Sequence, residues 1–392
     1  MAAAINTRFM LIVLKNSVCF TQRRFRVKTK WAGTRPKFPA TDLALQNFDA
    51  TYSIQLGDLW PSVRAAMLSE QKYGALVNNF SSTADLITDF QSQGCIDFTG
   101  VRCSPGEQTG SQTDSALITT SKTPETEPVR PDLSSSINCF VYPRGDISRF
   151  KPARPDSNGI LGYYLLDAAS VLPVLALDIQ QGHTALDLCA APGGKTLALL
   201  QTQRLRFLWA NDSSGSRITR LHRMLQSYIP KEYRTEDRVR ITSLDGRKFS
   251  EMEDQTFDRV LVDVPCTTDR HSLMEEDNNI FKRSRTKERQ RLPLLQTELL
   301  VAGIQAARLG GEVLYSTCSL SQLQNEYVVQ QAVNIAQEEF GITVEIQDLL
   351  WLTHHFQETF HFAPNLSVGE LVLPHLCANF GPIYMCKLRR VR

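Results

Sequence analysis

The chain has 392 residues, 42% of them apolar, which is enough for one large domain with appendages or for two domains. It contains no run of about 18 apolar residues, so the sequence predicts no membrane span. Its nine cysteines are scattered without a C-x-x-C pair, which argues against a disulfide framework or a metal site of the four-cysteine zinc type and favours a reducing compartment.

The formal net charge of +2 conceals a strongly basic N-terminus. Residues 1–41 contain nine lysines and arginines and no acid, and residues 42–392 contain 34 basic and 41 acidic residues, a net charge of −7. An acid-free, arginine-rich N-terminus predicts a mitochondrial transit peptide over about 1–41 and a location in the mitochondrial matrix. A disordered basic arm that binds nucleic acid and a secretory signal are the alternatives.

Two segments precede the main part of the chain. Residues 42–103 have a mostly helical pattern, with Pro61 at a helix start, and are expected to cover the main domain or to dock a partner. Residues 104–136 are rich in Ser, Thr, Pro, Gly and Glu and cannot bury enough apolar surface to offset their ordering entropy. This segment is therefore predicted to be a flexible linker or a large surface loop.

A basic stretch with an interleaved aromatic residue follows at 144–154. Arg144 and Arg149 are candidates for contacts with RNA phosphates, and Phe150 is a candidate for base stacking. The alternative is a solvated loop without a ligand.

From residue 163 onward, apolar segments with a helical pattern alternate with short apolar segments that are typical of strands. A helix is predicted over 163–177, and then short strands alternate with helices. The predicted strands are 185–189, 207–210, 239–243, 259–264 and 312–316, and the predicted helices are 196–202, 216–228, 288–308 and 325–339. Two late strands, 343–346 and 383–388, are expected without a helix between them. This order predicts an α/β fold with a doubly wound, mostly parallel Rossmann-like sheet, an antiparallel edge and a helical N-terminal extension.

A glycine-rich turn follows the first strand of that sheet. Gly193 and Gly194 precede Lys195, and small residues let the backbone approach a ligand closely while the helix start favours negative groups. A phosphate-binding Walker loop would need glycine where Cys189 stands, and the dinucleotide pattern G-x-G-x-x-G is absent.

Acidic residues end the next three predicted strands. Asp212, Asp245 (followed by Gly246) and Asp263 could accept hydrogen bonds from a ribose or a base, and Arg217 is a further candidate beside the cofactor. Each acid alone could simply cap a helix. As an ordered set they favour a ribose-bearing ligand that is not strongly anionic, such as S-adenosylmethionine.

Two predicted strands deliver a cysteine at their end, Cys266 and Cys318. Three motifs, A-A-P-G-G-K-T at 190–196, D-V-P-C-T at 263–267 and Y-S-T-C-S at 315–319, resemble those of the Sun-domain (NSUN-type) RNA cytosine-5 methyltransferases. The resemblance runs from about residue 140 to the C-terminus, so 137–392 is expected to be the methyltransferase domain. The stretches 263–273 and 278–285 look most like the mitochondrial ribosomal-RNA member of that family.

The resemblance implies a mechanism. Cys318 would add to carbon 6 of cytosine as the nucleophile, and Cys266 would assist release of the product. Asp263 would lie between cofactor and base, with Lys195 near the reacting groups. In DNA-acting relatives the nucleophile follows proline, which would nominate Cys266 instead.

The basic run 282–291 is a second candidate RNA contact, with Lys282, Arg283 and Arg285 at its start, although a solvated helix start is the alternative. The acidic remainder of the chain predicts weak non-specific RNA affinity. The resemblance implies ribosomal RNA as substrate and a protein partner of the mitochondrial transcription-termination-factor-like family. The alternative functions are a mainly non-catalytic ribosome-assembly scaffold and a methyltransferase for proteins or small molecules.

Overall fold

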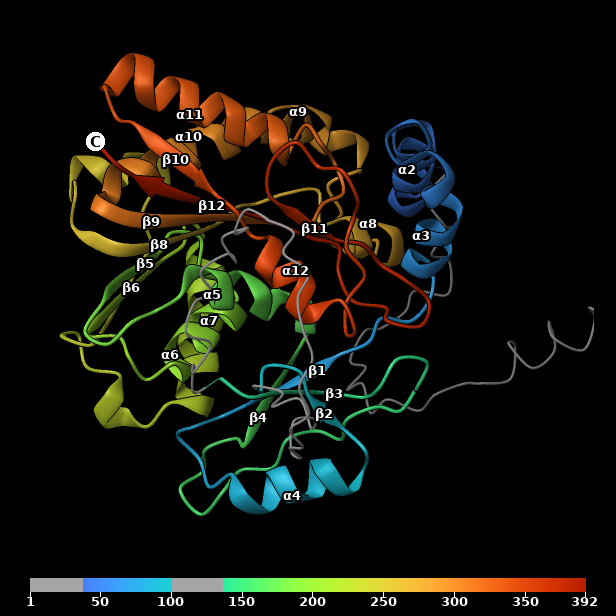
Figure 1. Cartoon of the computed structure of the whole chain (residues 1–392), viewed down its shortest axis with the longest axis vertical. Helices are drawn as coiled ribbons and strands as arrows, with labels where there is room; N and C mark the ends of the chain where they lie inside the picture. Colours follow the sequence, from blue (N-terminus) through green and yellow to red (C-terminus); the bar gives the residue numbers. More distant parts are fainter. Residues whose placement is uncertain (1–37, 101–136) are drawn as a thin grey trace, which may run out of the picture. The chain divides into compact units, whose positions relative to one another are not determined.

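The computed structural model describes residues 38–100 and 137–392 (Figure 1). The predicted linker at 104–136 and all but the end of the predicted transit peptide lie outside the described residues.

A mixed sheet forms the centre of the described part of the chain, with eight strands in the order β10-β12-β9-β8-β5-β6-β7 and β11 paired to β12. Strands β9, β8, β5, β6 and β7 are parallel to one another, whereas β12 is antiparallel to β9, β10 and β11. The strands are β5 (Thr184–Asp187), β6 (Phe207–Asn211), β7 (Val239–Thr242), β8 (Phe257–Asp263), β9 (Ala307–Thr317), β10 (Val344–Gln347), β11 (Glu370–Val372) and β12 (Ile383–Arg390). The predicted doubly wound sheet with an antiparallel edge is confirmed.

Helices cover both faces of this sheet. Along β8, Val260 and Val262 pack into one core and Leu261 into the other, because successive side chains of a strand point to opposite faces. In Figure 1, α10 and α11 lie on one face and α5, α6 and α7 on the other. These helices are α5 (Leu172–Leu177), α6 (Gly194–Gln201), α7 (Gly215–Tyr228), α10 (Leu292–Ala306) and α11 (Glu326–Phe340).

Two predicted helices differ in the structure. The segment predicted as one helix over 288–308 is divided into α9 (Thr286–Gln290) and α10, which has a proline in its first turn. Helix α12 (Leu350–Phe356) lies between β10 and β12, so the prediction that no helix separates the late strands is wrong. The short helix α8 (Asp269–Met274) follows β8.

The segment before the central sheet is less helical than predicted. It contains α2 (Ala40–Leu56), α3 (Trp60–Met67) and α4 (Ala84–Ser92), but also β1 (Gly74–Val77) and β2 (Ile96–Asp97). Within the described residues, these strands join β3 (Cys139–Val141) and β4 (Tyr163–Leu166) in an antiparallel sheet of order β2-β3-β1-β4. The helix predicted over 163–177 is therefore wrong in its first part.

The order of the parallel strands creates one switch point. The chain runs outward from β5 through β6 to β7, and then returns to β8 and β9 on the other side of β5. Connections leave β5 and β8 in opposite directions, which opens a crevice at the carboxyl ends of these two strands. Asp187 ends β5 and Asp263 ends β8.

Candidate active site

A cavity of about 200 Å³ lies at this switch point. It is lined by the turn after β5, by residues of β4 and by the end of β8. The lining residues are Tyr164, Leu165, Leu166, Ser170, Asp187, Cys189, Ala190, Ala191, Pro192, Gly194, Lys195 and Asp263. Three residues predicted from the sequence, Gly194, Lys195 and Asp263, are thus brought to one cavity.

Asp187 is a site residue that the sequence analysis missed. Its side chain is buried; Oδ2 accepts a hydrogen bond from Thr196 Oγ1 at 2.7 Å, whereas Oδ1 has no hydrogen-bond partner among the described residues. Burial raises the pKa of Asp187 to about 7. A buried acceptor without a partner costs free energy and would gain from a donor on a ligand in the cavity. Its position at the end of the first strand, just before the glycine turn, was the available signal.

Lys195 and Asp263 form an ion pair across the cavity. Lys195 Nζ lies 2.9 Å from Asp263 Oδ2, and Ser316 Oγ donates to Asp263 Oδ1 at 2.7 Å. Burial acts to lower the pKa of Lys195, but the adjacent Asp263 carboxylate outweighs it and raises that pKa above the usual lysine value. The pair therefore carries a fixed ammonium and a carboxylate at the end of β8.

The two predicted cysteines lie in contact. Cys266 Sγ and Cys318 Sγ are 3.1 Å apart, and both residues are half-buried. The hydrogen bond from Cys318 lowers the pKa of Cys266, and the backbone amide of Thr268 at 3.3 Å contributes in the same direction. The same contact raises the pKa of Cys318 well above the usual value, because only one of two touching sulfurs readily takes a negative charge. When the pair loses one proton, the negative charge is therefore favoured on Cys266, and the remaining proton is on Cys318.

A buried hydrogen-bond network holds the segments that carry these cysteines, 264–268 and 318–325, which we call the thiol loops. Gln324 is central to it: its Oε1 accepts from the Thr267 amide at 3.0 Å, and its Nε2 donates to Thr267 Oγ1 at 3.0 Å and to Ser319 Oγ at 3.2 Å. Asn325 donates to the Ser319 carbonyl oxygen at 2.9 Å. Satisfied buried polar networks of this kind fix a single geometry.

Asp212 and Arg217 meet at the glycine turn. Asp212 is buried and accepts from the Ala191 amide at 3.3 Å and from the Ser214 amide at 3.0 Å, and Arg217 lies 3.2 Å from its carboxylate. Arg217 also donates to the carbonyl oxygen of Ala191. These two residues hold the backbone of the turn and are not part of the cavity lining.

The remaining predicted cofactor residues have protein contacts of their own. Gly193 has φ 117°, a conformation that other residues rarely adopt, and a Cβ there would also lie 2.8 Å from Leu221 Cδ1 of α7, so this position favours glycine. Gly246 packs in the core, where a Cβ would lie 2.8 Å from Leu299 Cδ2. Asp245 accepts from the Arg247 amide at 3.1 Å and pairs with its guanidinium at 2.6 Å. None of the three is in the cavity lining.

In the first predicted RNA contact, 144–154, the candidate side chains make contacts within the protein. Arg144 is exposed and donates to the Gln357 carbonyl oxygen at 3.2 Å, and Arg149 is exposed and pairs with Glu70. The Phe150 ring packs against Tyr142 at 4.8 Å, within an aromatic cluster. These contacts occupy part of the half-buried Phe150 ring, and base stacking by this residue stays a prediction.

In the second basic run, 282–291, Arg285 likewise binds other parts of the protein. Arg285 pairs with Glu288 at 2.6 Å and donates to the Asn278 carbonyl oxygen at 2.6 Å. Lys282 is half-buried and Arg283 is exposed. The start of this run thus presents fewer uncompensated cationic side chains than the sequence indicates.

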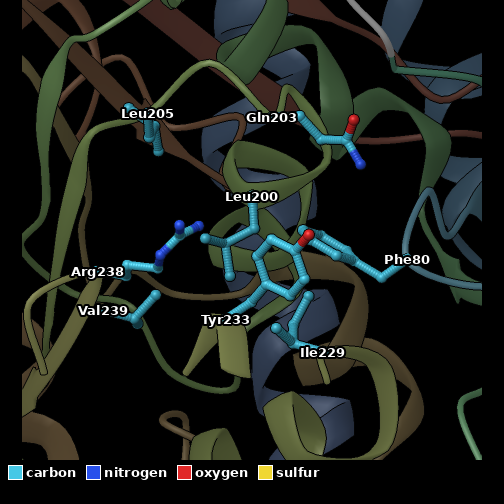
Figure 2. A pocket seen from close by; sticks show the side chains of 8 residues that line it. All are labelled: Phe80, Leu200, Gln203, Leu205, Ile229, Tyr233, Arg238 and Val239. Atoms are coloured by element: carbon cyan, nitrogen blue, oxygen red, sulfur yellow. The ribbon is translucent and has the colours of Figure 1, made fainter. Parts of the chain in front are cut away.

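A larger cavity, of about 270 Å³, lies at the opposite edge of the sheet, near the amino ends of β6 and β7 (Figure 2). Figure 2 shows Tyr233 between Arg238 and Phe80. The rings of Phe80 and Tyr233 make an edge contact, with their centroids 5.1 Å apart. Its lining consists of Phe80, Leu200, Gln203, Leu205, Ile229, Tyr233, Arg238 and Val239. None of these is a predicted site residue.

In residues 38–100 and 137–392, no helix has the length and hydropathy needed to cross a bilayer. The same residues contain no group of three or more His, Cys, Asp or Glu side chains arranged to hold a metal ion.

A family model described as 16S rRNA methyltransferase RsmB/F matches residues 174–375, which include the cavity turn and both thiol loops. The chain belongs to this family. The 5-cytosine rRNA methyltransferase NSUN4 of Xenopus laevis is 54% identical over 96% of this chain and 97% of its own length. The mitochondrial tRNA (cytosine(34)-C(5))-methyltransferase of Danio rerio is 35% identical over 91% of this chain and 90% of its own.

The fold of this RsmB/F family member is also found in a solved structure. A methyltransferase homolog protein from Pyrococcus horikoshii superposes with a TM-score of 0.59 over 91% of this chain and 99% of that chain, at 20% sequence identity. The predicted Sun-domain resemblance is confirmed, and the chain is a methyltransferase of that family.

Proposed function

We propose that this protein methylates carbon 5 of a cytosine in mitochondrial small-subunit ribosomal RNA, with S-adenosylmethionine as methyl donor and a covalent cysteine adduct as intermediate. The observation that carries the proposal is the contact between Cys266 and Cys318 at 3.1 Å, beside the Lys195–Asp263 pair. Carbon 5 of cytosine is a weak nucleophile, and a thiolate added at carbon 6 activates it.

The residues at the switch point fit the cofactor. S-adenosylmethionine carries an ammonium group and ribose hydroxyls, which are hydrogen-bond donors. Asp187 Oδ1 is a buried acceptor without a partner among the described residues, and its carboxyl group lines the cavity. When bound, the cofactor supplies a methyl group activated by a sulfonium centre.

Transfer of one proton between the two thiols serves both the attack on cytosine and the release of the product. The proton of Cys318 first passes to the Cys266 thiolate, and Cys318 then attacks carbon 6 of cytosine as the thiolate while Cys266 holds the proton. After methylation, a base removes the proton from carbon 5, the bond between Cys318 and carbon 6 breaks, and Cys266 protonates the leaving sulfur. The 3.1 Å separation allows direct proton transfer in each direction.

A mitochondrial site of action is supported by two observations. Residues 1–41 carry nine basic residues and no acid. The Danio rerio relative is named as a mitochondrial enzyme. The net charge of −7 over residues 42–392 favours weak RNA affinity and a need for a partner that strengthens RNA binding. The family resemblance implies that this partner is a helical-repeat protein of the mitochondrial transcription-termination-factor-like family.

Transfer of labelled methyl groups from S-adenosylmethionine to mitochondrial small-subunit rRNA tests the proposal. The expected product is 5-methylcytosine at defined positions in bisulfite mapping, absent with Cys318→Ala. Absence of transfer by the wild-type protein, with and without mitochondrial extract, would contradict it, as would full activity of Cys318→Ala. A deletion that impairs ribosome assembly while Cys318→Ala does not would favour the scaffold alternative.

A further inference from the structure

Helix α2 lies along the segment that follows Cys266. Its first two amides, of Ala40 and Thr41, each donate to the Glu276 carboxylate at 3.0 Å, just after the end of α8. Farther along, the Phe48 ring meets Phe281 edge to face at 5.1 Å. A helix that is anchored at its start and packed along its length has a fixed position on its neighbour.

The middle of α2 reaches the thiol loops through a buried hydrogen bond. Tyr52 Oη donates to Asp269 Oδ2 at 2.8 Å, and both side chains are buried. Asp269 also accepts from the Leu320 amide at 2.7 Å, from Ser319 Oγ at 3.2 Å and from Thr267 Oγ1. One carboxylate therefore joins both thiol loops to the helix.

The end of α2 makes a second contact with the loop that carries Cys318. Gln55 Nε2 donates to the Leu320 carbonyl oxygen at 2.6 Å, and the Gln322 amide donates to Gln55 Oε1 at 3.2 Å. Tyr52 and Gln55 are three positions apart, so they lie on one face of the helix.

The backbone beside Cys266 is strained. Thr268 has φ 47°, in the left-handed region that a β-branched residue rarely adopts. This conformation aims its amide at Cys266 Sγ at 3.3 Å. Such a conformation persists only where surrounding contacts hold it, and Asp269 is the next residue in the chain.

We propose that Tyr52 and Gln55 are positioning residues, through which helix α2 holds the two thiol loops at the spacing that keeps Cys266 and Cys318 in contact. This inference rests on the proposed function of the cysteine pair. It assigns helix α2 a positioning role in methyl transfer, beyond the cover predicted from the sequence.

Tyr52→Phe and Gln55→Ala test the inference in the full chain. Phenylalanine keeps the stacking of Tyr52 on Phe48 at 5.0 Å and removes only the hydroxyl. Ser53→Ala is the matched control, because the exposed Ser53 hydroxyl donates to the Asp49 carbonyl oxygen within α2 and to no other group of the described residues. The readouts are kcat and KM for methyl transfer, the thermal midpoint, and the pH profile of alkylation of Cys266 by iodoacetamide.

We expect Tyr52→Phe to lower kcat about tenfold, because it removes one hydrogen bond to a buried carboxylate, with KM for S-adenosylmethionine unchanged. The Cys266 alkylation profile should move to higher pH, since the thiol loops separate, and Gln55→Ala should act in the same direction. The inference is overturned if Cys266 keeps the wild-type alkylation profile in both variants. The same conclusion holds if methyl transfer falls in these variants only in proportion to the loss of folded protein. Alkylation needs no turnover, so this outcome is distinguishable from failure of the proposed methylation.

Discussion

Cys266 Sγ and Cys318 Sγ lie 3.1 Å apart although the two residues are 52 positions apart in the chain. The register of the sheet explains the contact: β8 and β9 run parallel with Asp263 opposite Ser316, so each cysteine leaves a neighbouring strand at the same edge. The thiol loops are then fixed by the buried amide of Gln324. Two reactive groups are thereby brought together before any substrate binds.

The shared proton gives a first prediction. Cys318→Ala removes the hydrogen bond that lowers the pKa of Cys266, so that pKa should rise and alkylation of Cys266 by iodoacetamide at neutral pH should slow severalfold. The exposed Cys377 provides an internal reference whose rate should not change. Residue-resolved mass spectrometry across a pH series measures both. An unchanged Cys266 profile would show that the two sulfurs titrate independently.

Asp263→Asn should disable the site more than it destabilises the fold. The amide cannot compensate the Lys195 ammonium, so the pKa of Lys195 should fall and kcat/KM should drop about 100-fold, corresponding to roughly 3 kcal/mol. Steady-state methyl transfer measures the loss. The matched control is Asp254→Asn, which alters an exposed carboxylate that bonds to the Gln255 side chain. Equal kinetics for the two variants would contradict the assigned role of Asp263.

Asp187→Asn should stabilise the ligand-free protein in a pH-dependent way. The folded-state pKa of about 7 exceeds the unfolded value, so as pH rises the unfolded chain ionises first and native stability falls until about pH 7. The gain from asparagine should thus be near zero around pH 4 and on the order of a few kcal/mol above neutrality. Urea unfolding at several pH values measures it, and a pH-independent difference would be inconsistent with this account. Cofactor affinity should fall in the same variant.

Two glycine substitutions distinguish a packing role of Gly246 from a contact with the cofactor. Gly246→Ala places a Cβ 2.8 Å from Leu299 Cδ2 and 3.2 Å from Leu188 Cγ, which should cost about 1–3 kcal/mol of stability. Gly215→Ala is the control, because nothing lies within 4 Å of its Cβ at the start of α7, and it should be neutral or stabilising. Thermal unfolding of both variants provides the test. A raised cofactor KM with normal stability in Gly246→Ala would instead support the ligand contact predicted from the sequence.

The parallel part of the central sheet was predictable because its strands contain short apolar segments bounded by turn residues, whereas the three-residue strand β11 at the antiparallel edge was not predicted. The antiparallel sheet before the central sheet was not predictable either. Strand β1 has four residues, all buried, and gives no alternating pattern to distinguish it from a helix. The apolar run that begins at Tyr163 is ambiguous for the same reason: it forms strand β4 and then turns at Asp167, whose carboxylate accepts from the Ala169 amide at 3.0 Å.

The site was predictable where it depends on local motifs and not where it depends on distant contacts. The turn at Gly193 and the two cysteines stand in short, recognisable stretches. The Tyr52–Asp269 hydrogen bond joins residues 217 positions apart, and neither residue has a local feature that indicates the other. The packing of the Phe150 ring against Tyr142 and Phe90 was likewise not predictable, because these residues become neighbours only through the fold.

The measurement that tests the central claim most directly is the covalent RNA–protein adduct formed by the two cysteine variants. Denaturing gels of each variant with substrate RNA and S-adenosylmethionine should show no adduct for Cys318→Ala and accumulated adduct for Cys266→Ala, because the latter lacks the thiol that assists release. An adduct with Cys318→Ala and none with Cys266→Ala would mean that the two roles are exchanged. Absence of an adduct from every variant and from wild-type protein on 5-azacytidine-containing RNA would contradict covalent catalysis itself.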